Sequence, residues 1–115
     1  MNAKDYLSRY GTLDAWLERI EQEYDAAPES FELEVSLESE SARCAQMERE
    51  TREMIHRLRD FKPAMVLLYR YVYLYPWDEL IRISGHSRST VFRWHKEGLA
   101  QVQEILDRKE GGILE

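Results

Sequence analysis

The stretch SGHSRSTVFRWH, residues 84–95, decides the fold of the C-terminal half of the chain. Gly85 follows a short apolar pattern and accepts the left-handed conformation that often ends a helix. Ser87, two residues later, is a good N-cap. We therefore predict a two-turn helix over about 76–84, a tight turn, and a longer helix over about 88–109. Two helices joined in this way are typical of a helix-turn-helix.

The helical repeat gives this unit an inner and an outer face. The inner residues, which hold the two helices at a fixed angle, are Leu80, Ile83, Val91 and Trp94. The outer face would enter the major groove of DNA, where arginine pairs with guanine and an aromatic ring can meet a thymine methyl group. The residues expected to read bases are Arg88, Ser89, Phe92 and Arg93. Those expected to contact phosphates are Arg82, Ser87, Thr90 and Lys96. The alternative is an ordinary helical hairpin whose outer face meets only water.

The charge of the chain is unevenly spread along the sequence. The formal net charge is −6, which by itself argues against a nucleic-acid ligand. Residues 1–60 hold eight basic and fifteen acidic side chains, whereas residues 61–115 hold eight basic and seven acidic ones. Residues 82–96 contain four cations and no acid. A local basic patch on an acidic protein suits a binder that engages phosphates at one face only.

The rest of the chain also reads as helix, so we expect an all-α fold. An apolar seam in steps of three and four predicts a long helix over about 3–26, and a second seam predicts another over about 38–60. Between them, FELEVSL alternates apolar and polar residues, which favours a short extended segment at 31–37. Two seams of matching period indicate a hairpin or a contact with a second copy of the chain.

A break at Asp60 to Pro63 divides the chain into two expected domains. Residues 1–60 would form an N-terminal helical hairpin that is available for dimerisation. Residues 61–110 would form a DNA-binding domain of three helices, the first of which runs over about 63–73 and is apolar almost all round.

Several classes of function have no support in the sequence. Cys44 is the only cysteine, so an internal disulfide and a zinc site of paired cysteines are excluded. His56, His86 and His95 lack the spacing of metal ligands. Phosphate-cradling glycines and an activated nucleophile are also missing, so we expect neither an enzyme nor a bound cofactor or metal. No apolar run is long enough to cross a membrane, and no signal peptide is evident, which favours a cytoplasmic protein.

The run LLYRYVYLYPWDELIRISGHSRSTVFRWHKEGL resembles the fourth region of bacterial sigma factors. It resembles more closely the late-gene transcriptional activators of phages and prophages of the RinA and ArpU type. The opening AKDYLSRYGTLDAWLERI is similar to the N-terminal helix of that phage family. Three residues depart from the pattern: Tyr75 replaces a capping serine or threonine, His86 replaces an apolar residue, and Gly98 stands where alanine would better support a helix.

The resemblance implies a DNA-binding transcriptional regulator of phage or prophage origin. Double-stranded DNA would be its ligand, a homodimer its functional unit, and RNA polymerase a further partner. Two alternatives remain open. One is a phage DNA-packaging subunit like the small terminase, whose DNA-binding unit normally comes first in the chain. The other is an acidic helical adaptor that binds polymerase or a sigma factor through Phe92 and Trp94.

Overall fold

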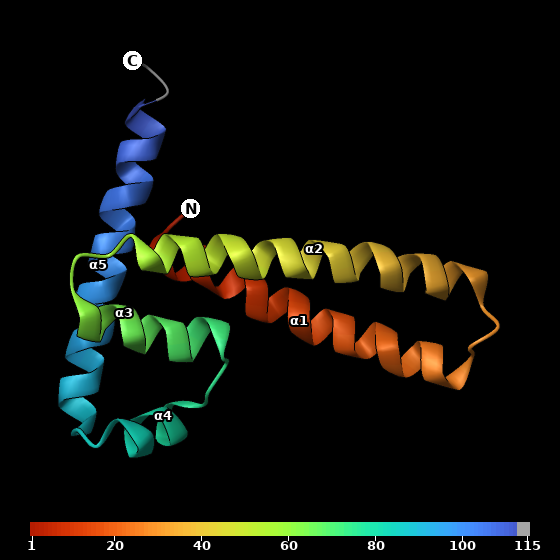
Figure 1. Ribbon diagram of the computed structural model, residues 1–115, viewed down its shortest axis with the longest axis horizontal. Coiled ribbons are helices and arrows are strands. Elements are labelled where there is room, and N and C mark those ends of the chain that lie inside the picture. The colour runs from red at the N-terminus through yellow and green to blue at the C-terminus, as the bar shows by residue number, and fades with distance from the viewer. Residues whose placement is uncertain (113–115) are drawn as a thin grey trace.

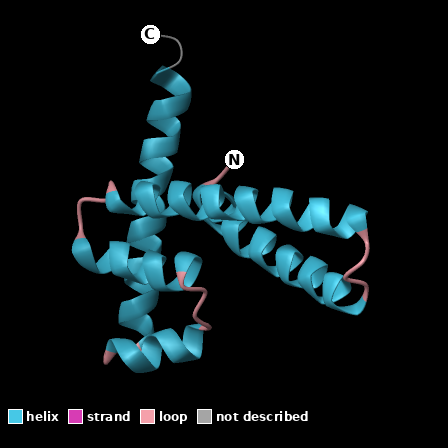
Figure 2. Cartoon of the chain, turned by 45° about the vertical axis from the view of Figure 1, so that its right-hand side comes forward, coloured by secondary structure: helices cyan, strands magenta, loops and turns pink. Residues whose placement is uncertain are grey.

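The protein is all-helical over the part of the chain that the structure describes, which confirms the predicted fold class. The structure is a computed structural model that describes residues 1–112, and the side chains of residues 1–109. Its elements are α1 (Ala3–Ala26), α2 (Phe31–His56), α3 (Phe61–Leu67), a π-helical turn η1 (Leu68–Val72), α4 (Trp77–Ser84) and α5 (Arg88–Gly112). In Figures 1 and 2, α1 and α2 lie side by side as one long arm, α5 crosses the base of this arm, and α3 and α4 lie below it.

Helix α1 has the bounds that its apolar seam predicts. The side chain of Asn2 accepts a hydrogen bond from the amide of Asp5 at 2.8 Å and so caps the first turn. The helix ends at Ala26, two residues before Pro28. Ile20, a member of the predicted seam, is buried. The apolar seam of α1 therefore contributes to the packing within the arm, where α1 runs antiparallel to α2.

The prediction of an extended segment at 31–37 is wrong, because these residues form the first two turns of α2. The side chain of Ser30 accepts a hydrogen bond from the amide of Leu33 and starts the helix at Phe31. A strict alternation also contains pairs four residues apart, which a helix places on one face. Leu33 and Leu37 form such a pair and are half-buried, whereas Phe31 and Val35 are exposed on the outside. No strand occurs in the described residues to pair with this segment.

One hydrophobic cluster joins the base of the arm to the C-terminal helices. Its most buried members are each at most 1% exposed and come from four elements: Leu7, Ile55, Leu67 and Val102. The expected domain boundary near residue 60 falls between α2 and α3, and residues on both sides of it share this cluster. A smaller cluster of Val66, Leu80 and Val91 joins α3 to α4 and to the start of α5.

The helix predicted at 63–73 is divided into two parts. Regular α-helix begins at Phe61, with Pro63 in its first turn, and continues only to Leu67. The next five residues form η1, in which the amide of Tyr73 donates to the carbonyl of Leu68. A π-helical turn takes in an extra residue and shifts all later ones around the helix axis.

The loop between α2 and α3 is fixed to α5 by one buried polar side chain. The Oε1 atom of Gln101 accepts a hydrogen bond from the amide of Arg59 at 2.9 Å, and its Nε2 donates to Asp60 Oδ2 at 2.7 Å. Gln101 is only 6% exposed, so both of its polar atoms have the partners that burial requires. This contact holds the start of α3 against α5.

The glycine at position 98, where alanine would favour a helix, lets α3 approach α5 closely. A Cβ atom added there would lie 3.0 Å from two side-chain atoms of Leu67 and 3.3 Å from the carbonyl oxygen of Pro63. The Pro63 oxygen belongs to the backbone and cannot turn aside. Gly98 therefore lowers the helix propensity of α5 but leaves room for Leu67 to pack in the main core.

We predict that Gly98→Ala destabilises the protein, although alanine favours a helix by about 1 kcal/mol. Overpacking against Leu67 and Pro63, which costs about 1–3 kcal/mol, should outweigh that gain and lower the free energy of unfolding by up to about 2 kcal/mol. Urea denaturation measures the change. Gly11→Ala is the control, because its Cβ would meet only the tip of the Leu74 side chain, at 3.1 Å, and should be neutral or stabilising. A stabilised Gly98→Ala protein would contradict the close contact.

Candidate nucleic-acid interface

The turn between α4 and α5 is built by two capping residues. Gly85 ends α4 with φ 71° and ψ 10°, the left-handed conformation that the sequence predicts. The Ser87 hydroxyl accepts a hydrogen bond from the amide of Thr90 at 3.2 Å, and the Ser87 carbonyl accepts from the amide of Val91 at 3.0 Å. The predicted N-cap is therefore confirmed. Because α4 stops and α5 starts within three residues, their relative direction is set locally.

Three of the four residues predicted to face inward do so. Leu80 and Val91 are 2% and 0% exposed and pack with Val66 of α3, while Trp94 is half-buried beside them. The prediction for Ile83 is wrong, because this side chain is 44% exposed. Ile83 borders an open pocket of about 260 Å³ between α3 and α4, so no neighbouring element covers it.

The structure brings the predicted outer residues of α5 together on one side of the helix. Arg88, Ser89, Phe92, Arg93 and Lys96 are all exposed. Phe92 is 37% exposed, and its ring makes a T-shaped contact with Trp77, with 4.9 Å between ring centroids. Phe92 therefore has a fixed position at the border of this face, whereas the charged residues extend from it.

Acidic side chains just outside the basic segment pair with its arginines. Arg88 Nη2 donates to Asp78 Oδ1 at 2.8 Å, and Arg93 Nε lies 3.9 Å from Glu97 Oε1. Arg82 pairs with Glu79, one turn away on α4, and this hydrogen bond raises the pKa of Arg82. Exposed pairs of this kind contribute little to stability, so a phosphate or a guanine edge could replace the acid at little cost.

Ser87 and Thr90 differ from the other residues expected to contact phosphates. Their hydroxyl oxygens lie 2.9 Å apart and serve the first turn of α5. Lys96, in contrast, is exposed, and its side chain takes part in no ion pair within the part of the chain that the structure describes. Lys96 is therefore a better candidate than Ser87 or Thr90 for a contact with a phosphate of a nucleic-acid backbone.

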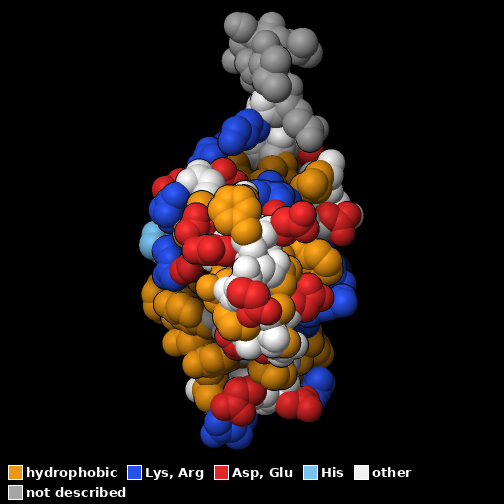
Figure 3. All heavy atoms as spheres, turned by 90° about the vertical axis from the view of Figure 1, so that its right-hand side faces the viewer, with side chains coloured by type: hydrophobic (Ala, Val, Ile, Leu, Met, Phe, Trp, Pro, Cys, Tyr) orange, Lys and Arg blue, Asp and Glu red, His pale blue; other side chains and the backbone are white. Residues whose placement is uncertain are grey.

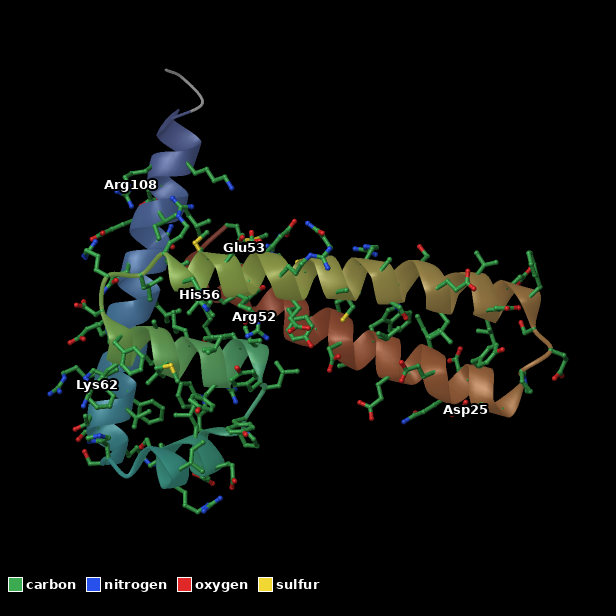
Figure 4. All side chains as sticks on the ribbon, in the orientation of Figure 1. Asp25, Arg52, Glu53, His56, Lys62 and Arg108 are labelled. Atoms are coloured by element: carbon green, nitrogen blue, oxygen red, sulfur yellow. The ribbon has the colours of Figure 1, made fainter. Side chains whose placement is uncertain are left out.

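A further cation, Lys62, lies next to α5 and was not among the residues predicted for the site. Lys62, labelled in Figure 4 at the start of α3, places its Nζ atom 4.9 Å from the centroid of the Trp94 ring. It lies 32 residues before Trp94 in the chain, and only the packing of α3 on α5 brings the two together. Sequence patterns describe neighbours along one helix and cannot predict such a contact.

His95, which has no metal-ligand spacing, belongs to a buried polar pair behind Phe92. A hydrogen bond of 2.8 Å joins His95 Nε2 to the hydroxyl of Tyr71, which is 7% exposed. The ring also meets the edge of Trp77, at 4.7 Å. Burial, together with the positive charges of Lys4 and Arg70, lowers the pKa of His95 from 6.5 to about 4. The imidazole is therefore neutral at physiological pH.

Clusters of metal-ligating side chains and helices that could cross a membrane are both absent from the described residues. No group of three or more His, Cys, Asp or Glu side chains within them lies close enough to hold a metal ion. None of the helices within residues 1–112 combines the length and the apolar character needed to cross a bilayer. Cys44 is a buried free thiol whose pKa is raised by burial.

Comparison with protein-family models, with curated proteins and with solved structures finds no match for this chain.

We predict that Gly85→Ala weakens the protein by about 1 kcal/mol, because a residue with a Cβ atom resists a positive φ. A Cβ at this position would have no neighbour within 4 Å, so the loss reports the backbone conformation alone. Thermal unfolding measures it. Gly85→Asn is the matched control and should lose less, since asparagine adopts the left-handed region more readily. Equal losses for the two variants would contradict this reading of the turn.

We predict that the free energy of unfolding falls as the pH is lowered from about 6.5 to 4, partly because of His95. Between these pH values His95 is protonated in the unfolded chain but not in the folded protein, so acid favours unfolding. The full stability is present above pH 6.5. Urea denaturation at several pH values measures the slope. His95→Gln keeps a hydrogen-bonding group but cannot titrate, so its slope should be shallower. Parallel curves for the two proteins would show that His95 is not held neutral.

Proposed function

We propose that the protein is a sequence-specific regulator of transcription that binds double-stranded DNA through α4, the turn at Gly85 and α5, acting as a helix-turn-helix. The observation that carries this proposal is the outer face of α5, which exposes Arg88, Ser89, Arg93 and Lys96 side by side. The opposite face holds Val91 in a core. A helix that is fixed on one side and basic on the other is suited to insertion into a major groove.

The residues of this face would have different roles in DNA recognition. Arg88 and Arg93 would exchange their carboxylate partners for the O6 and N7 atoms of guanine, while Ser89 would bond to a neighbouring base. Phe92, held in place by Trp77, would contact a thymine methyl group or a sugar. Lys96 would bind a phosphate, as would Arg82 after release from Glu79.

The distribution of charge over the whole molecule supports the same surface. Residues 12–42, which form the outer part of the arm, hold ten acidic side chains and one basic one. The rest of the chain holds twelve acidic and fifteen basic side chains. Figure 3 views the molecule from the loop end of the arm and shows acidic side chains spread over that face. DNA would therefore be repelled by the arm and would approach the end of the molecule that carries α5.

We further propose that the protein acts as a homodimer and originates from a phage or prophage, as the resemblance implies. One α5 offers few base contacts, so two copies on neighbouring half-sites would give useful specificity. The arm carries exposed Trp16, Phe31 and Val35, which offer apolar surface for self-association. Because each arm is strongly acidic, salt should strengthen a dimer formed there. RNA polymerase would be a further partner of the arm.

An acidic adaptor that binds protein instead of DNA is a second candidate. It is favoured by the ion pairs that already occupy Arg82, Arg88 and Arg93. It is also favoured by the exposed apolar side chains of Ile83 and Phe92 near the turn. Binding of a polymerase subunit that is unaffected by removal of the arginines, together with no affinity for DNA, would establish this function instead.

We predict that the protein enriches a defined motif from a random pool of double-stranded DNA at near-physiological salt. The variant Arg88→Ala/Arg93→Ala should fail to do so, because each lost base contact costs about 1–3 kcal/mol of specific affinity. Sequencing of the selected pool is the measurement, and the symmetry of the motif reports the number of copies bound.

Two control variants separate base reading from charge. Lys96→Ala should weaken binding to all sequences alike and lower the salt slope by about one. Arg43→Ala removes a cation from the arm and should leave selection unchanged. If the arginine variants lose the same affinity for specific and for random DNA, the outer face does not read bases.

A further inference from the structure

A second basic surface lies directly beside the outer face of α5 and contains residues from the opposite end of the sequence. A pocket of about 280 Å³ is lined by residues of α1, η1, α4 and α5: Lys4, Ser8, Arg70, Tyr71, Trp77, Phe92 and His95. Two of these side chains are cationic, and none is acidic. Because a water molecule takes up roughly 30 Å³ of liquid, the volume admits a hydrated phosphate group.

The walls of the pocket are held in place by contacts on three sides. Arg70 Nη1 donates to the carbonyl of Tyr75 at 3.0 Å, and its guanidinium lies 4.8 Å from the centroid of the Trp77 ring. The hydroxyl of Tyr71 bonds to His95 at the back. Lys4, which is exposed, has a long and adjustable side chain at the mouth.

The start of α1 is fixed to α5, so Lys4 keeps its place relative to the candidate interface. The amide of Ala3 donates to Gln103 Oε1 at 2.8 Å, and the Ser8 hydroxyl donates to the carbonyl of Lys4 at 2.7 Å. Ala3 and Leu7, on either side of Lys4, are buried in the main core. The backbone position of Lys4 is therefore fixed by its neighbours in the core of the protein.

The two charged side chains in the lining of the pocket, Lys4 and Arg70, are both cations. The charges of Lys4 and Arg70 both act on His95, since each contributes to its lowered pKa. Two acids adjoin lining residues in the chain, Asp5 next to Lys4 and Asp78 next to Trp77. Asp78 is paired with Arg88 at 2.8 Å. An anion in the pocket would thus meet two cations and hydroxyl groups without an opposing carboxylate in the lining.

We propose that this pocket binds a phosphate group of the nucleic-acid backbone and that Lys4 and Arg70 are its ligands. Phe92 belongs both to the pocket and to the outer face of α5, so a strand whose bases meet α5 would pass the mouth of the pocket. The N-terminal helix would then fix the register of α5 on the duplex, a role that phosphate contacts have in other DNA-binding proteins. The inference rests on the proposed DNA-binding function.

The test compares Lys4→Gln with Lys109→Gln, which makes the same change of charge near the other end of α5. Affinity for a labelled random-sequence duplex is measured by fluorescence anisotropy at several salt concentrations. One lost phosphate contact should reduce the salt slope by about 0.9 and weaken binding severalfold at low salt. Lys109→Gln should bind like the natural chain. Thermal unfolding of both variants shows that they are folded.

The second arm of the test uses inorganic pyrophosphate as a free anion, observed through the fluorescence of the tryptophans. Competition between pyrophosphate and the duplex that depends on Lys4 would support a phosphate site used by DNA. If the duplex binds and Lys96→Ala weakens it while Lys4→Gln does not, the pocket inference is overturned and the proposed function stands. If pyrophosphate binds through Lys4 but no duplex binds, the pocket takes a free anion. The inference that it binds a phosphate of DNA is then overturned. If neither ligand binds, both proposals fail.

Discussion

The structure depends on α5 belonging to two hydrophobic clusters at once. Val91, near its start, packs with α3 and α4, whereas Val102, Ile105 and Leu106 pack with both helices of the arm. Between these two groups, Gly98 brings α3 into contact with the helix backbone. One continuous helix therefore contacts all three parts of the structure, and Figure 1 shows it crossing the base of the arm and passing α3.

This arrangement makes the candidate interface rigid at its base and adjustable at its surface. The buried side of α5 cannot turn without disturbing Val91 and Leu80, which are almost fully covered. The arginines on the other side are held only by exposed ion pairs, which are weak. A surface of this kind can keep its orientation while its charged side chains change partners. The same helix also carries Gln103, through which the N-terminus of α1 is placed beside the basic face.

Local chemistry allowed much of the C-terminal unit to be predicted from the sequence. Gly85 and Ser87 act on residues within one turn of themselves, so their capping roles follow from residue type. The extended segment at 31–37 was wrong because an alternating pattern also contains the four-residue spacing of a helix. Ile83 was wrong because periodicity shows which side a residue faces but not whether another element covers that side. Gly98 appeared unfavourable for the same reason, since its value lies in a contact with α3.

The parts of the candidate site that could not be predicted are those that depend on distant contacts. Lys4 and His95 are more than 90 residues apart in the chain, and Lys62 reaches Trp94 only through the packing of α3. The acids that pair with the arginines are an intermediate case. Glu79 and Glu97 stand three and four residues from their partners, a spacing visible in the sequence. Asp78 is ten residues from Arg88, and the turn at Gly85 brings the two together.

The most direct test of the central claim, that the outer face of α5 is the surface that binds DNA, is a nuclear magnetic resonance titration. Backbone amide signals of the ¹⁵N-labelled chain would be followed while a short DNA duplex is added. If α5 binds the duplex, the signals of residues 88–96 will shift, and those of residues 20–40 in the acidic arm will change little. Shifts confined to the arm, or none at saturating duplex, would contradict it.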